Sequence, residues 1–492
     1  MEAMAHPAQP STTGPRTFVN PARPRYHYTP PNGWMNDPNG LVYFEGEYHL
    51  FYQARMPSHW GHAVGDDLLH WTDLPIAMAP DERGAIASGS CVVDWDDTSG
   101  FFGGKPGLVA IFTHWLVQEQ SIAYTTDRGR TWTKYAGNPV VENPGIPDFR
   151  DPKVIWHAPT QRWVMVLAVA DRVHFYVSPN LRVWAFASEF GAQDGAHSGV
   201  WECPDLVEIS VDGISGLRKW TLHISVNARH GRIMQYYVGE FDGTHFVNDN
   251  DPATTLWTDG GADYYAAVTW ATLAPGDERR VWLGWMSNWT YAKQLPTEPW
   301  QGMLSIPRRL GLKETSDGIR LYQEPIVELR QLRGSVRAWS NEVVAPGQSP
   351  LGDVRGRSVE IVAELEPGEA TALGFHVRMS DTERTTVRYD RHGRTISVAR
   401  GGVGMADLAP GFAGTHTSSV ALSDTGTIKL QIFLDECSIE VFANDGEAVI
   451  SDLIFPALAS DSLEVFSEGG EALLKSLSIY WLAELEGRLD EN

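Results

Sequence analysis

Short hydrophobic runs, each closed by a turn former, dominate the chain from about Tyr26 to Arg309. Gly, Pro, Asp or Asn bounds each run, and few stretches with the 3.6-residue period of a helix interrupt them. Examples are LVYFEGEYHLFYQ, GLVAIFTHW, KVIWHAP, RWVMVLAVA, WTLHISVN and VWLGWMSNW. An open sheet of this size would leave its edges unprotected, so the pattern requires a radial repeat or a large sandwich. We predict a β-propeller, although residue identity does not repeat clearly enough to count its blades.

The pattern changes at Tyr322–Arg333, where Ile326, Leu329 and Leu332 recur at three-residue steps between charged residues. This spacing predicts a short amphipathic connector. Alternation then returns in runs such as SVEIVAEL, TIKLQIFL and SLEVFS, which predicts a two-sheet β-sandwich. Its plainest role is to stabilise the fold without taking part in chemistry. The predicted all-β organisation is a propeller over residues 18–321, a linker over 322–334 and a β-sandwich over 335–485.

Composition agrees with many strands and tight turns, because the 492 residues include 47 Gly, 30 Pro, 19 Trp and 16 Tyr. Flat aromatic rings also suit the apolar faces of sugars. With 39 Lys and Arg against 62 Asp and Glu, the formal charge is −23, which excludes a general binder of nucleic acid or another polyanion. The apolar stretches are shorter than the roughly 18 to 20 residues of a membrane helix, so we predict no membrane partner.

The opening segment MEAMAHPAQPSTTGPRT is polar and rich in Pro, Ser and Thr, which predicts a loose arm. It lacks the charged and then apolar pattern of an export leader. Cys91, Cys203 and Cys437 are too scattered for a disulfide framework or a zinc site. We predict that all three are buried small hydrophobic residues.

Three carboxylates occur in settings unlike a solvated surface. Asp37 lies in the turn-forming string WMNDPNG, Asp151 follows Arg150 in FRDPKV, and Glu202 lies between Trp and Cys in WECPDL. Taken alone, Asp37 has a plainer interpretation as a turn cap, and Asp151 as part of an exposed ion cluster. The apolar neighbours of Glu202 predict a desolvated carboxyl with a raised pKa, as a general acid near neutral pH requires. Retaining glycosidases use two carboxyl groups about 5 to 5.5 Å apart, which acids at the ends of different blades could supply.

Signatures of other chemistries are missing from the sequence. It has no Gly-x-Ser-x-Gly elbow, no Gly-x-x-x-x-Gly-Lys-Ser/Thr phosphate loop, no His-Glu-x-x-His and no dinucleotide glycine fingerprint. His59 and His62 lie three apart, but no third ligand nearby completes a metal set. We therefore predict a structural or substrate-adjacent histidine pair and no metal. The string DRGRTW at 127–132 predicts a hairpin turn with a packing tryptophan.

A series of strings through the first module resembles glycoside hydrolase family 32, which comprises β-fructofuranosidases, inulinases, levanases and related fructosyltransferases. In family order, they are WMNDPNG (34–40), YHLFYQ (48–53), WGHAVGDDLLHW (60–71), SIAYTTDRGRTW (121–132), FRDPKV (149–154), WECPDL (201–206), DYYAA (263–267), GWMSNWTYA (284–292) and SIPRRL (305–310). Downstream, ECSIEVFANDGE (436–447) resembles the C-terminal sandwich of that family. The resemblance covers the chain from about residue 20 to 485.

The resemblance implies a five-bladed β-propeller followed by a C-terminal β-sandwich, with the active site in the axial funnel and without a metal or organic cofactor. On matching positions, the resemblance implies that Asp37 is the nucleophile at C2 of a fructosyl unit and that Glu202 is the acid/base. Asp151 is expected to hold two fructose hydroxyls and to stabilise the transition state. The predicted substrate-binding residues are Asn36, Gln53, Trp60, Ser88, Arg150, Cys203, Tyr265 and Trp289. Although Asn288-Trp289-Thr290 is formally a glycosylation string, we expect Trp289 to line the funnel.

Two departures from the family pattern bear on the reaction. Only ARMPSH lies between Gln53 and Trp60, where the family has a longer stretch with another tryptophan. Ala87 stands before Ser-Gly-Ser, where the family commonly has Phe. Both changes predict a wider first subsite, as in levan fructotransferases, in which the 6-hydroxyl of a bound difructosyl unit closes a ring and gives difructose dianhydride. We favour this transfer, with hydrolysis by an ordinary levanase, inulinase or β-fructofuranosidase as the alternative.

A different class, a sugar-binding protein of the same fold that has lost catalysis, is disfavoured because all three carboxylates are present. The expected partner is a fructan polysaccharide or oligosaccharide, and the acidic surface suits a neutral substrate that needs no electrostatic steering. Because such polymers are too large to enter a cell, we expect secretion. No pattern in the sequence predicts an oligomeric state.

Overall fold

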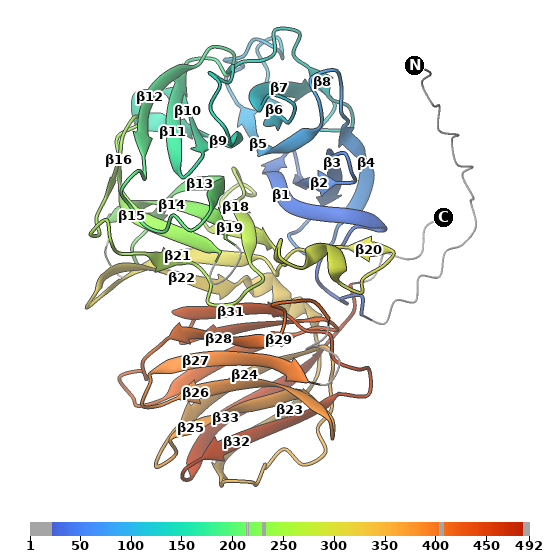
Figure 1. Ribbon diagram of the computed structural model, residues 1–492, viewed down its shortest axis with the longest axis vertical. Helices are drawn as coiled ribbons and strands as arrows, with labels where there is room; N and C mark the ends of the chain where they lie inside the picture. Colours follow the sequence, from blue (N-terminus) through green and yellow to red (C-terminus); the bar gives the residue numbers. More distant parts are fainter. Residues whose placement is uncertain (1–21, 213, 215, 229–232, 403–407, 486–492) are drawn as a thin grey trace, which may run out of the picture.

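The computed structural model describes residues 22–485, apart from 213, 215, 229–232 and 403–407. In these residues the chain is all-β, with a five-bladed propeller followed by a β-sandwich, as predicted (Figure 1). The predicted loose arm at the start of the chain lies outside the described residues. No helix in the described part is both long and apolar enough to cross a lipid bilayer.

Each blade is an antiparallel sheet built from consecutive strands. The first blade contains β1 (Gly33–Phe44), β2 (Glu47–Ala54), β3 (His59–Gly65) and β4 (Thr72–Met78). The second contains β5 (Ile86–Asp94), β6 (Gly107–His114), β7 (Glu119–Thr125) and β8 (Thr133–Lys134). The third contains β9 (Phe149–His157), β10 (Arg162–Val169), β11 (Arg172–Ser178) and β12 (Ala185–Phe190), with the 3₁₀ turn η1 (Ala158–Thr160) between β9 and β10.

The last two blades follow the same plan with short additions. The fourth contains β13 (Val200–Ser210), β14 (Arg218–Asn227), β15 (Met234–Phe241), β16 (Phe246–Asn248) and β17 (Leu256–Trp257). The fifth contains β18 (Tyr265–Thr269), β19 (Arg280–Trp285), β21 (Arg308–Thr315) and β22 (Gly318–Pro325). Between β19 and β21 lie the 3₁₀ turn η2 (Ala292–Gln294) and β20 (Trp300–Gln301), which pairs in parallel with β1. This pairing ties the fifth blade to the first and closes the ring.

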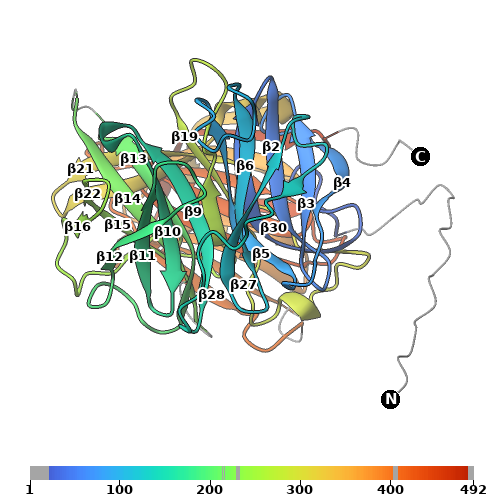
Figure 2. The ribbon, with the colours of Figure 1, turned by 90° about the horizontal axis from the view of Figure 1, so that it is seen from above.

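The first strands of the blades surround the propeller axis. Each of β1, β5, β9, β13 and β18 contacts the first strands of both neighbouring blades, and β5, β9 and β13 run alongside one another in Figure 2. Hydrophobic clusters fill the space between blades, such as the one that joins Val109 and Ile111 of the second blade to Val154 and Met165 of the third. Because five rigid sheets pack against one another in this way, the ends of their first strands are held in fixed positions.

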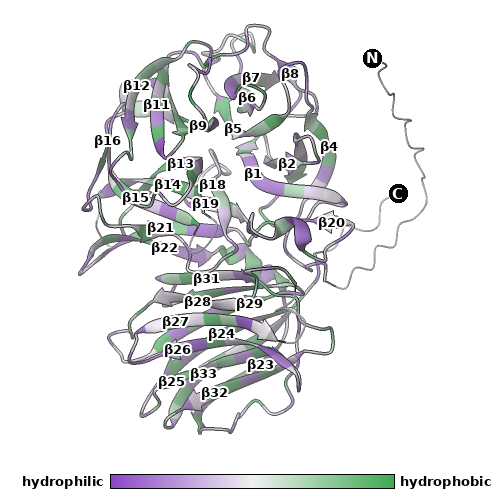
Figure 3. Cartoon of the chain, viewed as in Figure 1, coloured by the Kyte–Doolittle hydropathy of each residue, from purple (hydrophilic) through white to green (hydrophobic). Residues whose placement is uncertain are grey.

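The sandwich consists of two antiparallel sheets. One contains β23 (Arg333–Val344), β24 (Val359–Glu366), β29 (Ile428–Leu434), β30 (Ser438–Ala443), β31 (Ala448–Leu453) and β33 (Ala472–Leu482). The other contains β25 (Ala372–Met379), β26 (Glu383–Asp390), β27 (Thr395–Gly402), β28 (Gly414–Ser419) and β32 (Ser462–Glu468). Hydrophobic and hydrophilic residues alternate along these strands, and the hydrophobic ones meet between the sheets (Figure 3).

The predicted connector is shorter than its sequence pattern suggested. Tyr322–Pro325 completes β22, so the fifth blade continues to Pro325 rather than ending at residue 321. The 3₁₀ turn η3 (Val327–Leu332) follows, and β23 begins directly at Arg333. Ile326, Leu329 and Leu332 are all buried in a cluster that includes residues of both modules. The three-residue spacing thus marks a 3₁₀ turn that is packed between propeller and sandwich.

Buried ion pairs fasten the sandwich to the propeller. Arg308 of β21 is fully buried and contacts Asp259 at 3.1 Å and Glu440 of β30, while Arg400 of β27 contacts Asp263. His27 contacts Asp435 at 2.8 Å and Glu440 at 2.9 Å. Burial alone lowers the pKa of His27, but these two carboxylates outweigh burial and raise that pKa to about 9. These contacts join the two modules. In Figure 1 the sandwich lies beside the propeller ring and does not cover the face of the ring that is in view.

Candidate active site

A local irregularity in the first strand of every blade builds the candidate site. The register with the second strand shifts between Met35 and Pro38, Ile86 and Gly89, Arg150 and Lys153, Glu202 and Asp205, and Tyr265 and Val268. Three residues in these segments, Asp151, Cys203 and Ala266, have φ values of 63°, 47° and 52°. Bulges of this kind turn side chains away from the sheet. Here all five turn toward the mouth of the same axial funnel, so Asp37, Ser88, Asp151, Glu202 and Tyr265 come together.

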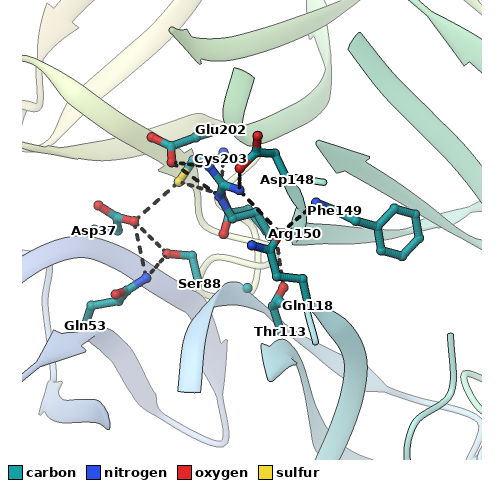
Figure 4. A network of polar contacts seen from close by, with 12 residues as sticks. Asp37, Gln53, Ser88, Thr113, Gln118, Asp148, Phe149, Arg150, Glu202 and Cys203 are labelled. Carbon is teal, nitrogen blue, oxygen red and sulfur yellow. Dashed lines mark hydrogen bonds and ion pairs between the residues drawn. The ribbon is translucent and has the colours of Figure 1, made fainter. Parts of the chain in front are cut away.

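Asp37 lies in β1 and is surrounded by hydrogen-bond donors (Figure 4). Its Oδ2 accepts from the Ser88 hydroxyl at 2.7 Å and from Gln53 Nε2 at 3.4 Å. Its Oδ1 accepts from Asn36 Nδ2 at 2.9 Å, and Cys203 Sγ lies 3.5 Å from Oδ2. With only 7% of its surface exposed, Asp37 is held in one orientation, as a nucleophile requires.

Asp151 lies in β9 and is 6% exposed. Its Oδ2 accepts from the backbone N–H of Cys203 at 3.1 Å, and its own N–H donates to the Thr113 hydroxyl at 3.0 Å. Burial raises its pKa to about 7; the positive charge of Arg150 opposes this rise, and the negative charges of Glu202 and Asp37 add to it. The Asp151 carboxyl therefore lies in the electrostatic field of both other acids.

Glu202 lies in β13 and has polar rather than apolar partners. Its Oε1 accepts from Arg150 Nη2 at 2.8 Å and Nε at 3.3 Å, and its Oε2 accepts from the Tyr265 hydroxyl. The prediction of an apolar environment around the Glu202 carboxyl is therefore wrong. The neighbouring Trp201 is fully buried with its indole N–H directed to the carbonyl of Ala196, because adjacent strand residues face opposite sides of the sheet.

Arg150 connects Glu202 to a group of residues that the sequence did not indicate. Its Nη1 donates to Asp148 Oδ1 at 2.5 Å and to Gln118 Oε1 at 3.4 Å. The ring of Trp115, 49% exposed at the β6–β7 turn, lies 5.6 Å from the guanidinium carbon. Asp148 directly precedes the string FRDPKV, so the sequence already indicates that it lies near Arg150 and Asp151. By contrast, nothing in the sequence connects Trp115 or Gln118 to an acid far along the chain.

The other predicted substrate-binding residues divide into two groups. Asn36, Gln53, Ser88 and Cys203 all contact Asp37, directly or through one another. Trp60 differs, because it is fully buried among Phe51 and Phe112, and its indole N–H donates to the carbonyl of Ala87 at 2.8 Å. It thus has no surface for a sugar, and its predicted direct contact with substrate is wrong.

Trp289 lies beside Trp34 and Trp285, with ring centroids 6.0 and 4.6 Å away. Trp34 in turn donates its indole N–H to Asn36 Oδ1 at 2.7 Å, and Asn36 donates to Asp37. The group of three tryptophans therefore lies next to the site that contains Asp37. Asn288 is buried and its amide donates to the carbonyl of Ala262 at 3.0 Å. That contact leaves the formal glycosylation string without an accessible amide.

His59 and His62, which the sequence predicts as a structural or substrate-adjacent pair, have separate partners. His62 is buried and contacts His49 at 3.0 Å, whereas His59 is partly exposed and faces the carbonyl of Pro57. All three cysteines are free and buried, as predicted. Within the residues that the structure describes, no three His, Cys, Asp or Glu side chains are grouped so that they could hold a metal ion.

Comparison with known proteins identifies the family. The model of the glycosyl hydrolases family 32 N-terminal domain matches residues 27–325, and the model of the family 32 C-terminal domain matches residues 328–481. The chain belongs to glycoside hydrolase family 32. It is therefore a glycosidase, and the two matched segments meet at the connector between propeller and sandwich.

Several relatives of this family 32 chain have names and structures. It is 49% identical to a levanase of Bacillus subtilis (strain 168) over 94% of this chain and 71% of the relative. It is 43% identical to a levanase of Bacillus sp. (strain L7) over 90% of this chain, which spans half of that relative. The crystal structure of exo-inulinase from Aspergillus awamori superposes with a TM-score of 0.88 at 34% identity, covering 96% of this chain and all of that one.

The raised pKa of Asp151 predicts that the ionised form of this residue destabilises the folded enzyme, so that the free energy of unfolding is lower at high pH than at low pH. A folded-state pKa near 7, against 3.8 as the ordinary value, means that the folded state holds the proton more tightly, so stability falls as pH rises through this window. In Asp151→Asn, which cannot ionise, we expect this loss to disappear. The difference in Tm, variant minus parent, should therefore be about 1 to 3 °C more positive at pH 8 than at pH 4.5 in thermal unfolding scans.

Asp148→Asn is the matched control for this comparison, because Asp148 contacts the same arginine but its side chain is 34% exposed. It should show no such rise in relative Tm. An Asp151→Asn variant whose Tm difference from the parent is equal at both pH values would contradict the prediction.

Proposed function

We propose that this protein is a fructan hydrolase that cleaves β-2,6-linked levan with retention of configuration and releases fructose. The observation that carries the proposal is the meeting of Asp37, Asp151 and Glu202 around Cys203 at one mouth of the propeller. Retaining glycosidases require two carboxyl groups on either side of the same bond. A third acid, which touches neither the attacking nor the leaving atom, supports the sugar ring between them.

In the proposed reaction, Asp37 attacks C2 of the terminal fructosyl unit, while Glu202 protonates the leaving oxygen. The C2–O bond to the rest of the chain breaks and a fructosyl–Asp37 ester forms. Glu202, now ionised, takes a proton from a water molecule, which attacks C2 and releases Asp37. Asp151 accepts hydrogen bonds from two fructose hydroxyls as positive charge develops on the ring. Arg150 and Tyr265 hold the Glu202 carboxyl in place for both proton transfers.

The relatives favour hydrolysis, and levan over inulin. The two levanases are 49% and 43% identical to this chain, whereas an exo-inulinase from Aspergillus awamori is 35% identical. That exo-inulinase is named as extracellular, which supports the expectation that this enzyme too acts outside the cell.

The surroundings of Ala87 weaken the argument for intramolecular transfer. Ala87 is only 3% exposed, so replacing an aromatic residue by its methyl group adds little room at the surface of the pocket. The backbone N–H of Trp115 donates to the carbonyl of Ala85 at 2.9 Å, which places an aromatic residue of another loop beside this segment. We therefore rank hydrolysis ahead of the formation of difructose dianhydride.

Product analysis on levan separates the two reactions. Hydrolysis should give fructose and a continuous rise in reducing sugar, because each cut frees an anomeric carbon. Transfer to an internal hydroxyl would give a non-reducing dianhydride that is one water lighter than a free difructose, visible by mass spectrometry. Inulin digested in parallel should release fructose more slowly. Dianhydride as the main product would overturn the hydrolytic proposal, and the absence of any product from both polymers would overturn the assignment of fructan as substrate.

A further inference from the structure

The end of the propeller axis opposite the active site holds a second hollow, which we call the rear pocket. It has a volume of about 810 Å³ and is bordered by the far ends of the first strands, including Trp95 after β5, Trp156 in β9 and Glu208 in β13. Asp151 and Trp156 lie five residues apart along β9, which corresponds to about 16 Å at roughly 3.3 Å per residue. The rear pocket is thus separate from the site that contains the three acids.

A buried plug closes the axis between the two ends. Lys153 Nζ contacts Asp205 Oδ1 at 2.5 Å and donates to the carbonyl of Thr269 at 2.8 Å, and the side chains of Lys153 and Asp205 are 4% and 0% exposed. The void on the active-site side of this plug measures about 10 Å³, enough for about one water molecule. A sugar chain therefore cannot pass through the propeller, and a ligand in the rear pocket must enter from the opposite face.

Two tryptophans in the rear pocket are exposed to an unusual degree for such large apolar side chains. Trp95 is 57% exposed and Trp156 is 40% exposed. Trp156 packs edge-on against the buried Trp163, with ring centroids 5.1 Å apart, so its orientation is fixed. Exposed aromatic groups in a hollow are typical of ligand sites, and a flat indole ring fits the C–H face of a sugar.

The charges of the rear pocket point to a neutral ligand. Two of the three lysine and arginine side chains that line it have acidic partners: Lys153 contacts Asp205, and Arg279 contacts Asp277 at 2.7 Å and Glu328 at 2.5 Å. The third, Arg280, donates to the backbone carbonyl of Glu208 at 3.1 Å. The lining acid Glu240 contacts Lys219 at 2.6 Å. Paired groups of both signs offer hydrogen bonds to hydroxyls without a net charge that would attract a phosphate or another ion. Aromatic surfaces beside such polar groups are typical of sites for neutral sugars.

We propose that the rear pocket is a second carbohydrate-binding site, which holds a stretch of neutral fructan chain against Trp95 and Trp156 without cleaving it. This inference rests on the proposed function, because that function makes a polymeric fructan the sugar that this protein meets. A polymer held at the rear face stays near the enzyme, so its free ends reach the active site at a raised local concentration. Short substrates gain nothing from this site.

Affinity electrophoresis in gels that contain levan tests the second site directly. The parent for this experiment is the Asp37→Asn variant, which is expected not to digest the gel. Adding Trp95→Ala and Trp156→Ala should weaken levan binding about fivefold or more, as expected for the loss of two aromatic contacts. Phe186→Ala in the same parent is the matched control, because Phe186 is 55% exposed on β12, away from the rear pocket, and should leave binding unchanged.

Activity measurements on the catalytically intact protein complete the test. Trp95→Ala/Trp156→Ala should hydrolyse sucrose or a short fructo-oligosaccharide at the parental rate, which also shows that it is folded, while its KM for long-chain levan rises. The milder Trp95→Phe/Trp156→Phe variant should restore most of the binding. Levan binding equal to the parent, or an equal loss on Phe186→Ala, would overturn the second site. Failure of the proposed function would appear differently, as an intact protein that does not release fructose from levan at all.

Discussion

Replacing Asp37 by Asn is expected to lower kcat on levan by about 10⁴-fold or more, the loss typical of removing a nucleophile that forms a covalent intermediate. The amide has the volume of the carboxylate but cannot form the fructosyl ester. The Ser88 hydroxyl and Cys203 Sγ, which now contact Asp37 Oδ2 at 2.7 and 3.5 Å, can remain beside the new side chain. Fructan binding should therefore persist, and single-turnover measurements should show no fructosyl-enzyme.

Asp66→Asn is the matched control for this change, since Asp66 is an exposed acid just after β3 in the same blade. It should retain full activity. A kcat for Asp37→Asn within tenfold of the parent would show that another group attacks C2. Loss of fructan binding together with activity would point to a disturbed pocket, so binding is measured on the same preparation.

The fold could be predicted from the sequence because its signal is repeated many times. Runs such as RWVMVLAVA and WTLHISVN coincide with β10 and β14, and alternation in Ser335–Leu482 coincides with the strands of the sandwich. The blade number was a different matter. Packing between blades needs only apolar residues of suitable volume, so the blades share a shape without sharing a sequence, and the number five came from the family resemblance.

The position of the site was also encoded locally, although its cause is visible only in the structure. Asp37, Asp151 and Cys203 each precede a proline, and proline within a strand pattern indicates a bulge or an edge. All three positions are bulges that turn side chains toward the funnel. A sequence with several acid–proline or cysteine–proline pairs at strand starts therefore contains a signal for convergence. The plainer interpretations, Asp37 as a turn cap and Asp151 as part of an ion cluster, do not use this signal.

The surroundings of the site residues were less predictable, because they depend on contacts between blades. Glu202 follows a tryptophan in sequence, yet its partners are Arg150 from the third blade and Tyr265 from the fifth. Trp60 lies in a string typical of the family, yet strand alternation directs it into the core. Neighbours along a strand face opposite ways, so sequence proximity says little about which groups surround a carboxyl.

Replacing Glu202 by Gln should lower kcat about 10² to 10⁴-fold on levan, the range for loss of general acid catalysis. The loss should depend on the leaving group. An aryl fructoside with an acidic phenol needs little protonation, so formation of the fructosyl-enzyme should stay close to the parental rate on that substrate. The second step still needs a general base to activate water, and the intermediate should therefore accumulate and give a burst of phenol.

The contacts of Glu202 make this test specific. Gln keeps the length of the side chain and can still accept from Arg150, so a rate loss reports the missing proton rather than a collapsed site. Glu189→Gln, at a half-exposed acid on β12, should change neither the rate nor its dependence on the leaving group. Equal losses for good and poor leaving groups would contradict the acid role of Glu202 and assign it to holding Arg150. A pre-steady-state burst in Glu202→Gln, absent from Asp37→Asn, would place the two residues on successive steps of one retaining mechanism.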